Sequence, residues 1–116
     1  MMIQLSRNNY EPDIVFFSKQ KSQAFSREQL LFPAPDLVVE ILSDSTRQND
    51  YGIKFLDYAA HRVAEYWIID PDANTLEQYV LLEDRFELQH KLDSQGTLTS
   101  LIIPGFRMEL AVIFAE

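Results

Sequence analysis

The chain of 116 residues has no cysteine, only 3 glycines and no long apolar segment, and these absences exclude several classes of protein. Without cysteine it can form neither a disulfide nor a thiolate metal site. No apolar run approaches the roughly 20 residues that span a bilayer. The first residues also lack the charged and apolar regions of a signal peptide. We therefore expect a cytoplasmic protein that has no membrane partner.

Positive charge is scarce as well. Ten lysine and arginine residues stand against 18 aspartate and glutamate residues, and the net charge is −8. Tight, nonspecific nucleic-acid binding depends on lysine and arginine at the phosphates, so this balance argues against it. It argues less strongly against a metal-dependent nuclease, because a divalent ion can neutralise clustered acids in such an enzyme.

Apolar and aromatic residues, by contrast, are plentiful. Hydrophobic residues make up 47% of the chain, which includes 8 phenylalanines and 5 tyrosines. This composition is typical of a packed core rather than of a disordered or fibrous protein. No internal repeat interrupts the chain, so residues 1–116 are expected to form one domain.

The most informative segment is the apolar run 35–43, because it carries Glu40 inside it. Its valine, leucine and isoleucine residues are typical of a buried strand. A carboxylate buried there is costly unless it is paired or binds a cation. Asp36 shares a strand face with Glu40 but lies roughly 13 Å away along the strand, so the two cannot hold one ion. A second Pro-Asp before an apolar run makes Asp13 the candidate partner on a neighbouring strand.

The apolar pattern predicts an α/β (α+β) fold. It indicates strands at 13–18, 36–43, 65–70, 75–82, 86–92 and 97–103, a helix at 47–62, a helical turn at 27–31 and a closing helix at 108–115. The helix between the second and third strands predicts a parallel crossover. Strands that are apolar on both faces need cover on each side of the sheet. One long helix covers one face, so either a partner covers the other or a segment is missing.

Lys54, in the predicted helix, is the best candidate for the positive group that a phosphodiester-cleaving site needs. With Mg²⁺ or Mn²⁺ held by Asp13 and Glu40, the lysine would orient a water molecule or help to deprotonate it. Simpler interpretations stay open. Aspartate after proline is common turn chemistry for Asp13, and backbone or tyrosine groups could satisfy Glu40. Lys54 could pair on the helix surface with Asp50 or Asp57.

These residues resemble the Uma family of putative restriction endonucleases, which is common in cyanobacteria. The resemblance runs from about residue 10 onward and rests on five runs and three single residues: 12–16, 35–43, 45–46, 65–71, 103–106, Asp50, Lys54 and Tyr58. It implies a restriction-endonuclease-like mixed central sheet with flanking helices, of the PD-(D/E)-x-K nuclease superfamily. It also implies that family members carry a further N-terminal part, so the chain is expected to be N-terminally truncated.

The resemblance assigns roles to particular residues. Asp13 matches the first acid of the family motif and Glu40 the second, and both would bind Mg²⁺. The motif lysine would stand at Leu42, so its role is expected to have moved to Lys54.

Three functions follow as hypotheses. The first is a Mg²⁺-dependent endonuclease acting on nucleic acid through Asp13, Glu40 and Lys54. The second is a shortened, inactive paralogue that acts as an interaction module and forms a homodimer, because an uncovered apolar sheet face favours self-association. The third is an acidic protein that binds basic partners, motivated by the net charge of −8.

Overall fold

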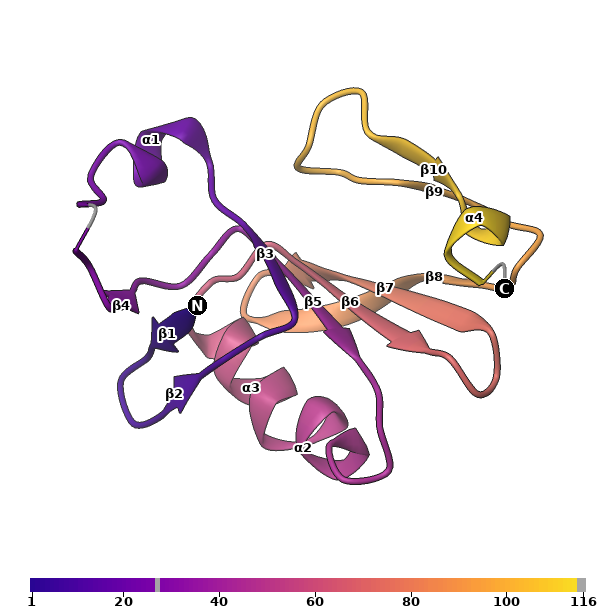
Figure 1. Ribbon diagram of the computed structural model, residues 1–116, viewed down its shortest axis with the longest axis horizontal. Helices are drawn as coiled ribbons and strands as arrows, with labels where there is room; N and C mark the ends of the chain where they lie inside the picture. The colour runs from indigo at the N-terminus through magenta and orange to yellow at the C-terminus, as the bar shows by residue number, and fades with distance from the viewer. Residues whose placement is uncertain (27, 115–116) are drawn as a thin grey trace.

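A five-stranded mixed sheet forms the centre of the molecule, whose computed structural model describes residues 1–26 and 28–114 (Figure 1). The strand order is β3-β5-β6-β7-β8. These strands are β3 (Ile14–Phe16), β5 (Leu37–Ile41), β6 (Glu65–Asp70), β7 (Thr75–Leu82) and β8 (Arg85–Leu92). Strands β5 and β6 are parallel, and the other neighbours are antiparallel. The predicted parallel crossover is therefore confirmed, and the predicted strands 75–82 and 86–92 form the antiparallel pair β7–β8.

The connection from β5 to β6 contains two helices, α2 (Arg47–Tyr51) and α3 (Ile53–Ala60), where the sequence predicts one. The break lies at Gly52, whose φ of −101° and ψ of −106° are not helical. A Cβ atom at Gly52 would lie 2.6 Å from the carbonyl oxygen of Gln48. This close approach requires glycine. The prediction of an unbroken helix over 47–62 is therefore wrong at this residue.

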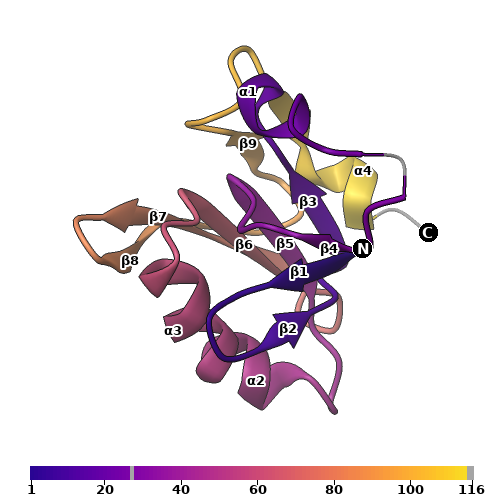
Figure 2. The same ribbon diagram turned by 90° about the vertical axis from the view of Figure 1, so that its left-hand side faces the viewer.

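Helix α3 and an N-terminal three-stranded sheet cover one face of the central sheet (Figure 2). The small sheet has the order β2-β1-β4, with β1 (Met2–Gln4), β2 (Asn9–Tyr10) and β4 (Leu31–Phe32). Because side chains alternate along a strand, every second residue of β5 and β6 faces this side. The buried cluster here includes Ile3, Val38, Tyr58, Tyr66, Ile68 and Phe86.

The C-terminal segment covers the opposite face (Figure 1). It consists of the hairpin β9 (Thr97–Thr99) and β10 (Arg107–Glu109), followed by α4 (Leu110–Phe114). The buried residues on this side are Leu37, Val39, Trp67, Ile69, Leu76, Leu98 and Leu110. The C-terminal segment of the chain itself therefore supplies part of the cover that the sequence analysis assigned to a partner or a missing segment, and an apolar groove remains beside it. This cover consists of a short hairpin and a helix of little more than one turn, both too short to show a clear apolar pattern in the sequence.

Three short elements differ from the sequence prediction. In the described part of the 19–34 loop, the only helix is α1 (Lys19–Ser22), which Ser18 caps. The helical turn predicted at 27–31 does not form over the described residues 28–31, and residue 27 lies outside the described residues. The predicted strand 97–103 ends at 99, because the Ser100 hydroxyl accepts the next free amides, of Ile102 and Ile103. The predicted helix 108–115 starts as strand β10 and becomes helical only at 110, and residue 115 lies outside the described residues.

Among the described residues, no helix has the length and apolar character needed to cross a membrane.

Candidate functional site

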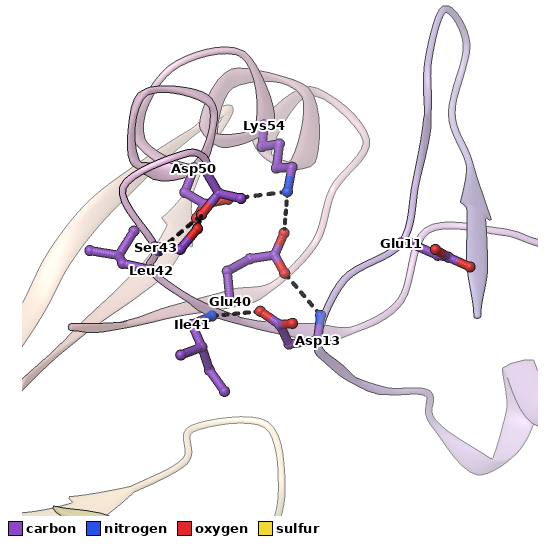
Figure 3. A pocket seen from close by; sticks show the side chains of 9 residues that line it. Glu11, Asp13, Glu40, Ile41, Leu42, Ser43, Asp50 and Lys54 are labelled. Carbon is purple, nitrogen blue, oxygen red and sulfur yellow. Dashed lines mark hydrogen bonds and ion pairs between the residues drawn. The ribbon is translucent and has the colours of Figure 1, made fainter. Parts of the chain in front are cut away.

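Strands β3 and β5 bring Asp13 beside Glu40. In the antiparallel register Ile14 lies opposite Val39, so Asp13, one residue before β3, comes next to Glu40. The backbone N–H of Asp13 donates to Oε1 of Glu40 at 2.9 Å. The backbone N–H of Ile41 in turn donates to Oδ2 of Asp13 at 2.7 Å (Figure 3). These two hydrogen bonds hold both carboxylates at the same end of the sheet.

Lys54 completes the cluster from α3. Its Nζ donates to Oε2 of Glu40 at 2.9 Å and to Oδ1 of Asp50 at 3.1 Å. The side chains of Glu40 and Asp50 are 3% and 2% exposed, and that of Lys54 is 18% exposed. Lys54 is therefore no surface lysine. It joins two buried carboxylates.

Burial and pairing act in opposite directions on these groups. Burial raises the pKa of Glu40 above its ordinary value, although the hydrogen bonds from Lys54 and from the amide of Asp13 oppose the shift. Burial alone would lower the pKa of Lys54, but its contacts with Glu40 and Asp50 outweigh that effect and raise the pKa. The lysine is therefore held as a cation among carboxylates.

The cluster lies at a cavity of about 380 Å³. Its lining is Glu11, Asp13, Glu40, Ile41, Leu42, Ser43, Thr46, Asp50 and Lys54. Figure 3 shows a chain of contacts that runs from Asp50 through Lys54 to Glu40 and Asp13, with Glu11 lying apart from it. The cavity thus exposes acidic oxygens that outnumber the single ammonium beside them.

This donor set fits a magnesium-like ion. Within the described residues, no group of three or more His, Cys, Asp or Glu side chains converges in a way that could hold a metal. Mg²⁺, however, usually keeps several waters and binds through one or two carboxylates together with substrate phosphates. Asp13 and Glu40 supply two hard oxygen donors at an open cavity, which meets that requirement.

Asp50 is the residue of this cluster that sequence reasoning undervalued. The sequence offers it as a surface partner of Lys54 and as one of the residues that carry the family resemblance, but not as a buried residue, yet it is 1% exposed and lines the cavity. The hydroxyl of Tyr66 donates to the backbone carbonyl of Asp50 at 2.9 Å and ties α2 to β6. The sequence could have indicated this pair, because residues four apart on a helix place their side chains next to each other.

The structure keeps Asp36 out of the cluster, as strand geometry predicts. Its carboxylate accepts the backbone N–H of Ser18 at 2.6 Å and pairs with Lys21 at 3.1 Å. His61 also has structural partners: its ring accepts from the backbone of Ser6 and donates to the carbonyl of Asp57. Neither residue is available to the cavity.

The mixed sheet with a parallel β5–β6 crossover and flanking helices defines a restriction-endonuclease-like fold, and comparison with solved structures supports this assignment. A crystal structure titled as a putative nuclease belonging to DUF820, from Anabaena variabilis ATCC 29413, matches with a TM-score of 0.73 and 21% sequence identity. The match covers 97% of this chain and 64% of that chain, so this protein spans about 64% of the length of that nuclease.

This chain belongs to the Uma2 family, which is described as putative restriction endonuclease, and the family model matches residues 1–112. The resemblance inferred from the sequence is therefore confirmed. A search among curated proteins found no match.

Proposed function

We propose that this protein is a Mg²⁺-dependent endonuclease that hydrolyses phosphodiester bonds of nucleic acid. The observation that carries the proposal is the contact chain at the cavity, in which Glu40 bonds both to Asp13 and to Lys54. Membership of the Uma2 family and the likeness to a protein titled as a putative nuclease support the same chemistry.

Asp13 and Glu40 are the residues that would hold the ion, and Mn²⁺ could replace Mg²⁺ because both accept hard oxygen ligands. When bound, the ion would supply Lewis-acid stabilisation of the charge that develops on the phosphodiester. The amide of Asp13 donates to Glu40 and the amide of Ile41 donates to Asp13, and these hydrogen bonds fix the oxygens of both acids before any ion or substrate arrives. Such prior ordering lowers the cost of assembling a catalytic site.

Lys54 would act as a cation and as a hydrogen-bond donor. Its raised pKa means that Nζ keeps its proton at neutral pH, so it is poorly suited to be a general base. Two of its protons are engaged by Glu40 and Asp50. Since an ammonium has three donors, one remains to orient a water molecule or a phosphate oxygen. Of the two roles that the sequence suggests for Lys54, orientation is therefore the better supported.

The first test is direct incubation with nucleic acid. We expect the purified protein to nick supercoiled plasmid, or to cut single-stranded DNA or RNA, when Mg²⁺ or Mn²⁺ is present. Chelation of the ion should stop cleavage, and added Mg²⁺ should restore it. The two carboxylates are negative, so without the ion they cannot stabilise the negative charge of the scissile phosphate. Gel electrophoresis of all three substrates measures this. Cleavage that persists after complete chelation would contradict the proposal.

A second candidate function is self-association of an inactive chain, and an apolar groove favours it. The groove has a volume of about 460 Å³, and its lining is Ile14, Val15, Phe16, Leu37, Val39, Ile41, Trp67, Ile69, Ile103, Phe106, Met108 and Ile113. Strand β3 forms one wall, and its other edge is free because β3 pairs only with β5 among the described strands. A free edge beside an apolar surface favours a second copy of the same chain as the occupant.

Sedimentation tests this second function. We expect a dimer that tightens as salt rises, because salt screens the repulsion between two chains of net charge −8. Met108→Lys, inside the groove, should give a monomer. Val112→Lys on α4 is the matched control, because Val112 is 74% exposed and lies outside the groove lining. A wild-type protein that sediments as a monomer at all salt concentrations would rule out self-association.

A further inference from the structure

The Lys54 ammonium is shared between two buried acids that belong to different elements. Glu40 projects from β5, and Asp50 projects from α2. The two contacts are nearly equal in length, 2.9 Å to Glu40 and 3.1 Å to Asp50. The cation is therefore not committed to Glu40 alone.

Asp50 is itself firmly placed. It is 1% exposed, and its backbone carbonyl accepts the hydroxyl of Tyr66, which is fully buried in the core. Gly52 then bends the chain between Asp50 and Lys54. Because the backbone of Asp50 is held in this way and its side chain is buried, its carboxylate is a fixed anchor for the flexible side chain of Lys54.

The sharing of Lys54 matters because both carboxylate oxygens of Glu40 already accept hydrogen bonds. Oε1 accepts the amide of Asp13, and Oε2 accepts Lys54. A carboxylate offers about four acceptor sites in total. If Asp50 were absent, Glu40 would be the only carboxylate bonded to Lys54, and the ammonium would settle closer to it. An ammonium on Glu40 competes directly with a divalent ion for the same oxygens.

We propose that Asp50 is a positioning residue that shares the Lys54 ammonium with Glu40, holds it back from closer contact with Glu40 and so leaves the Glu40 oxygens more accessible to the metal. The proposal rests on the proposed function, because it assumes that Glu40 is a metal ligand. It assigns to Asp50 a role exerted through Lys54, with no contact between Asp50 and the ion.

Direct attraction is the rival explanation. A negative charge near a cation strengthens its binding whether or not a lysine stands between them. The two explanations differ in one respect: attraction persists when Lys54 is replaced, and positioning does not. A double-mutant cycle between Asp50 and Lys54 separates them.

The experiment measures Mn²⁺ binding to the intact protein by electron paramagnetic resonance, without substrate. Asp50→Asn should weaken Mn²⁺ binding by about tenfold or more, the usual cost of losing a group that orients a metal ligand. In a Lys54→Gln background, the same Asp50→Asn change should alter binding by less than about twofold. Glutamine keeps two hydrogen-bond donors for Glu40 and Asp50 but carries no charge.

Asp44→Asn is the matched control for net charge, since Asp44 lies in the loop before α2 and does not line the cavity. It should leave Mn²⁺ binding unchanged. Circular dichroism establishes that each variant is folded. If Lys54→Gln does not fold, Lys54→Met replaces it, because methionine is also unbranched and uncharged. The Asp50→Asn change should again alter binding by less than about twofold in that background.

The outcomes separate this inference from the proposed function. If Asp50→Asn weakens Mn²⁺ binding equally in the wild-type and the Lys54→Gln backgrounds, Asp50 acts directly and the positioning role is overturned, while the nuclease proposal stands. If the wild type and Glu40→Gln bind Mn²⁺ equally, the metal site is not at Glu40 and both proposals fail.

Discussion

Replacing Glu40 with glutamine should abolish nicking of plasmid in Mg²⁺ while the protein stays folded. The variant removes one of two carboxylates proposed to bind the ion and leaves the Asp50–Lys54 pair in place. Loss of a group that merely orients a metal ligand costs about 10–100-fold, so loss of the ligand itself should cost more than about 100-fold. Initial rates of plasmid nicking, with wild type and variant at equal concentration, measure the effect.

The pH dependence of stability should also change, for a reason that is visible in the site. Burial raises the pKa of Glu40 above its unperturbed value of 4.5. A carboxyl group with a raised pKa in the folded state contributes stability below its unfolded pKa. That contribution is lost as pH rises through the folded pKa. Glutamine carries no such proton, so Glu40→Gln should flatten this part of the pH dependence of unfolding, and circular dichroism checks that the variant is folded.

Glu87→Gln is the matched control. Glu87 is exposed on β8, where it pairs with Arg85, and it lies outside the cavity lining. Its nicking rate should equal that of the wild type. Equal nicking by Glu40→Gln and the wild type would remove Glu40 from the catalytic machinery and end the present assignment.

The second large effect is expected at Glu65, on the opposite face of the sheet. This residue begins β6 and is fully buried. Its carboxylate accepts four hydrogen bonds, and among the described residues no lysine or arginine pairs with it. The donors are the Trp67 indole N–H, the Gln78 amide at 3.0 Å, the Ser100 hydroxyl at 3.2 Å and the Leu101 backbone N–H at 2.8 Å.

Glu65→Gln should therefore destabilise the protein by about 3 kcal/mol. The glutamine NH₂ group would face donors where the carboxylate offered an acceptor. Each buried donor that is left unpaired costs roughly 1–3 kcal/mol. Because Ser100 and Leu101 lead from β9 toward β10, the C-terminal cover should loosen first, and its amides should exchange faster with solvent.

Urea unfolding measures the loss of stability, and hydrogen exchange locates it. The exposed Glu83→Gln change, in the β7–β8 turn, should stay within about 0.5 kcal/mol of the wild type. If Glu65→Gln unfolds at the same urea concentration as the wild type, the four hydrogen bonds do not hold the C-terminal segment on the sheet.

Much of the central sheet could be predicted from the sequence because its strands are marked by local patterns of apolar and turn residues. The run 65–70 is apolar and β-rich, and the turn after it leads into a hairpin, so β6, β7 and β8 were all predicted within a few residues. The packing of the C-terminal cover on the sheet and its strand β10 were not predicted, although β9 and α4 form within the predicted strand 97–103 and the predicted helix 108–115. Its strands are three residues long, and they are specified by contacts with Trp67 and Leu76 across the core rather than by periodicity. Short elements of that kind depend on tertiary packing.

The same division applies to the site. Alternation along β5 determines that Val38 and Glu40 face the same side, and the cost of burying a carboxylate determines that Glu40 needs a cation or a donor. Both conclusions follow from the sequence alone. Whether Asp13 would reach Glu40 was decided by the antiparallel register of β3.

The place of Lys54 likewise required the fold. In the sequence it is equally well suited to a surface pair with Asp50 or to the core. In the structure it pairs with Asp50 and is also largely buried, because Lys54 of α3 contacts both Asp50 of α2 and Glu40 of β5, and both carboxylates are buried. The sequence by itself determined that an acid is buried in the sheet. Only the tertiary structure decided which groups surround it, because those contacts join residues far apart in the chain.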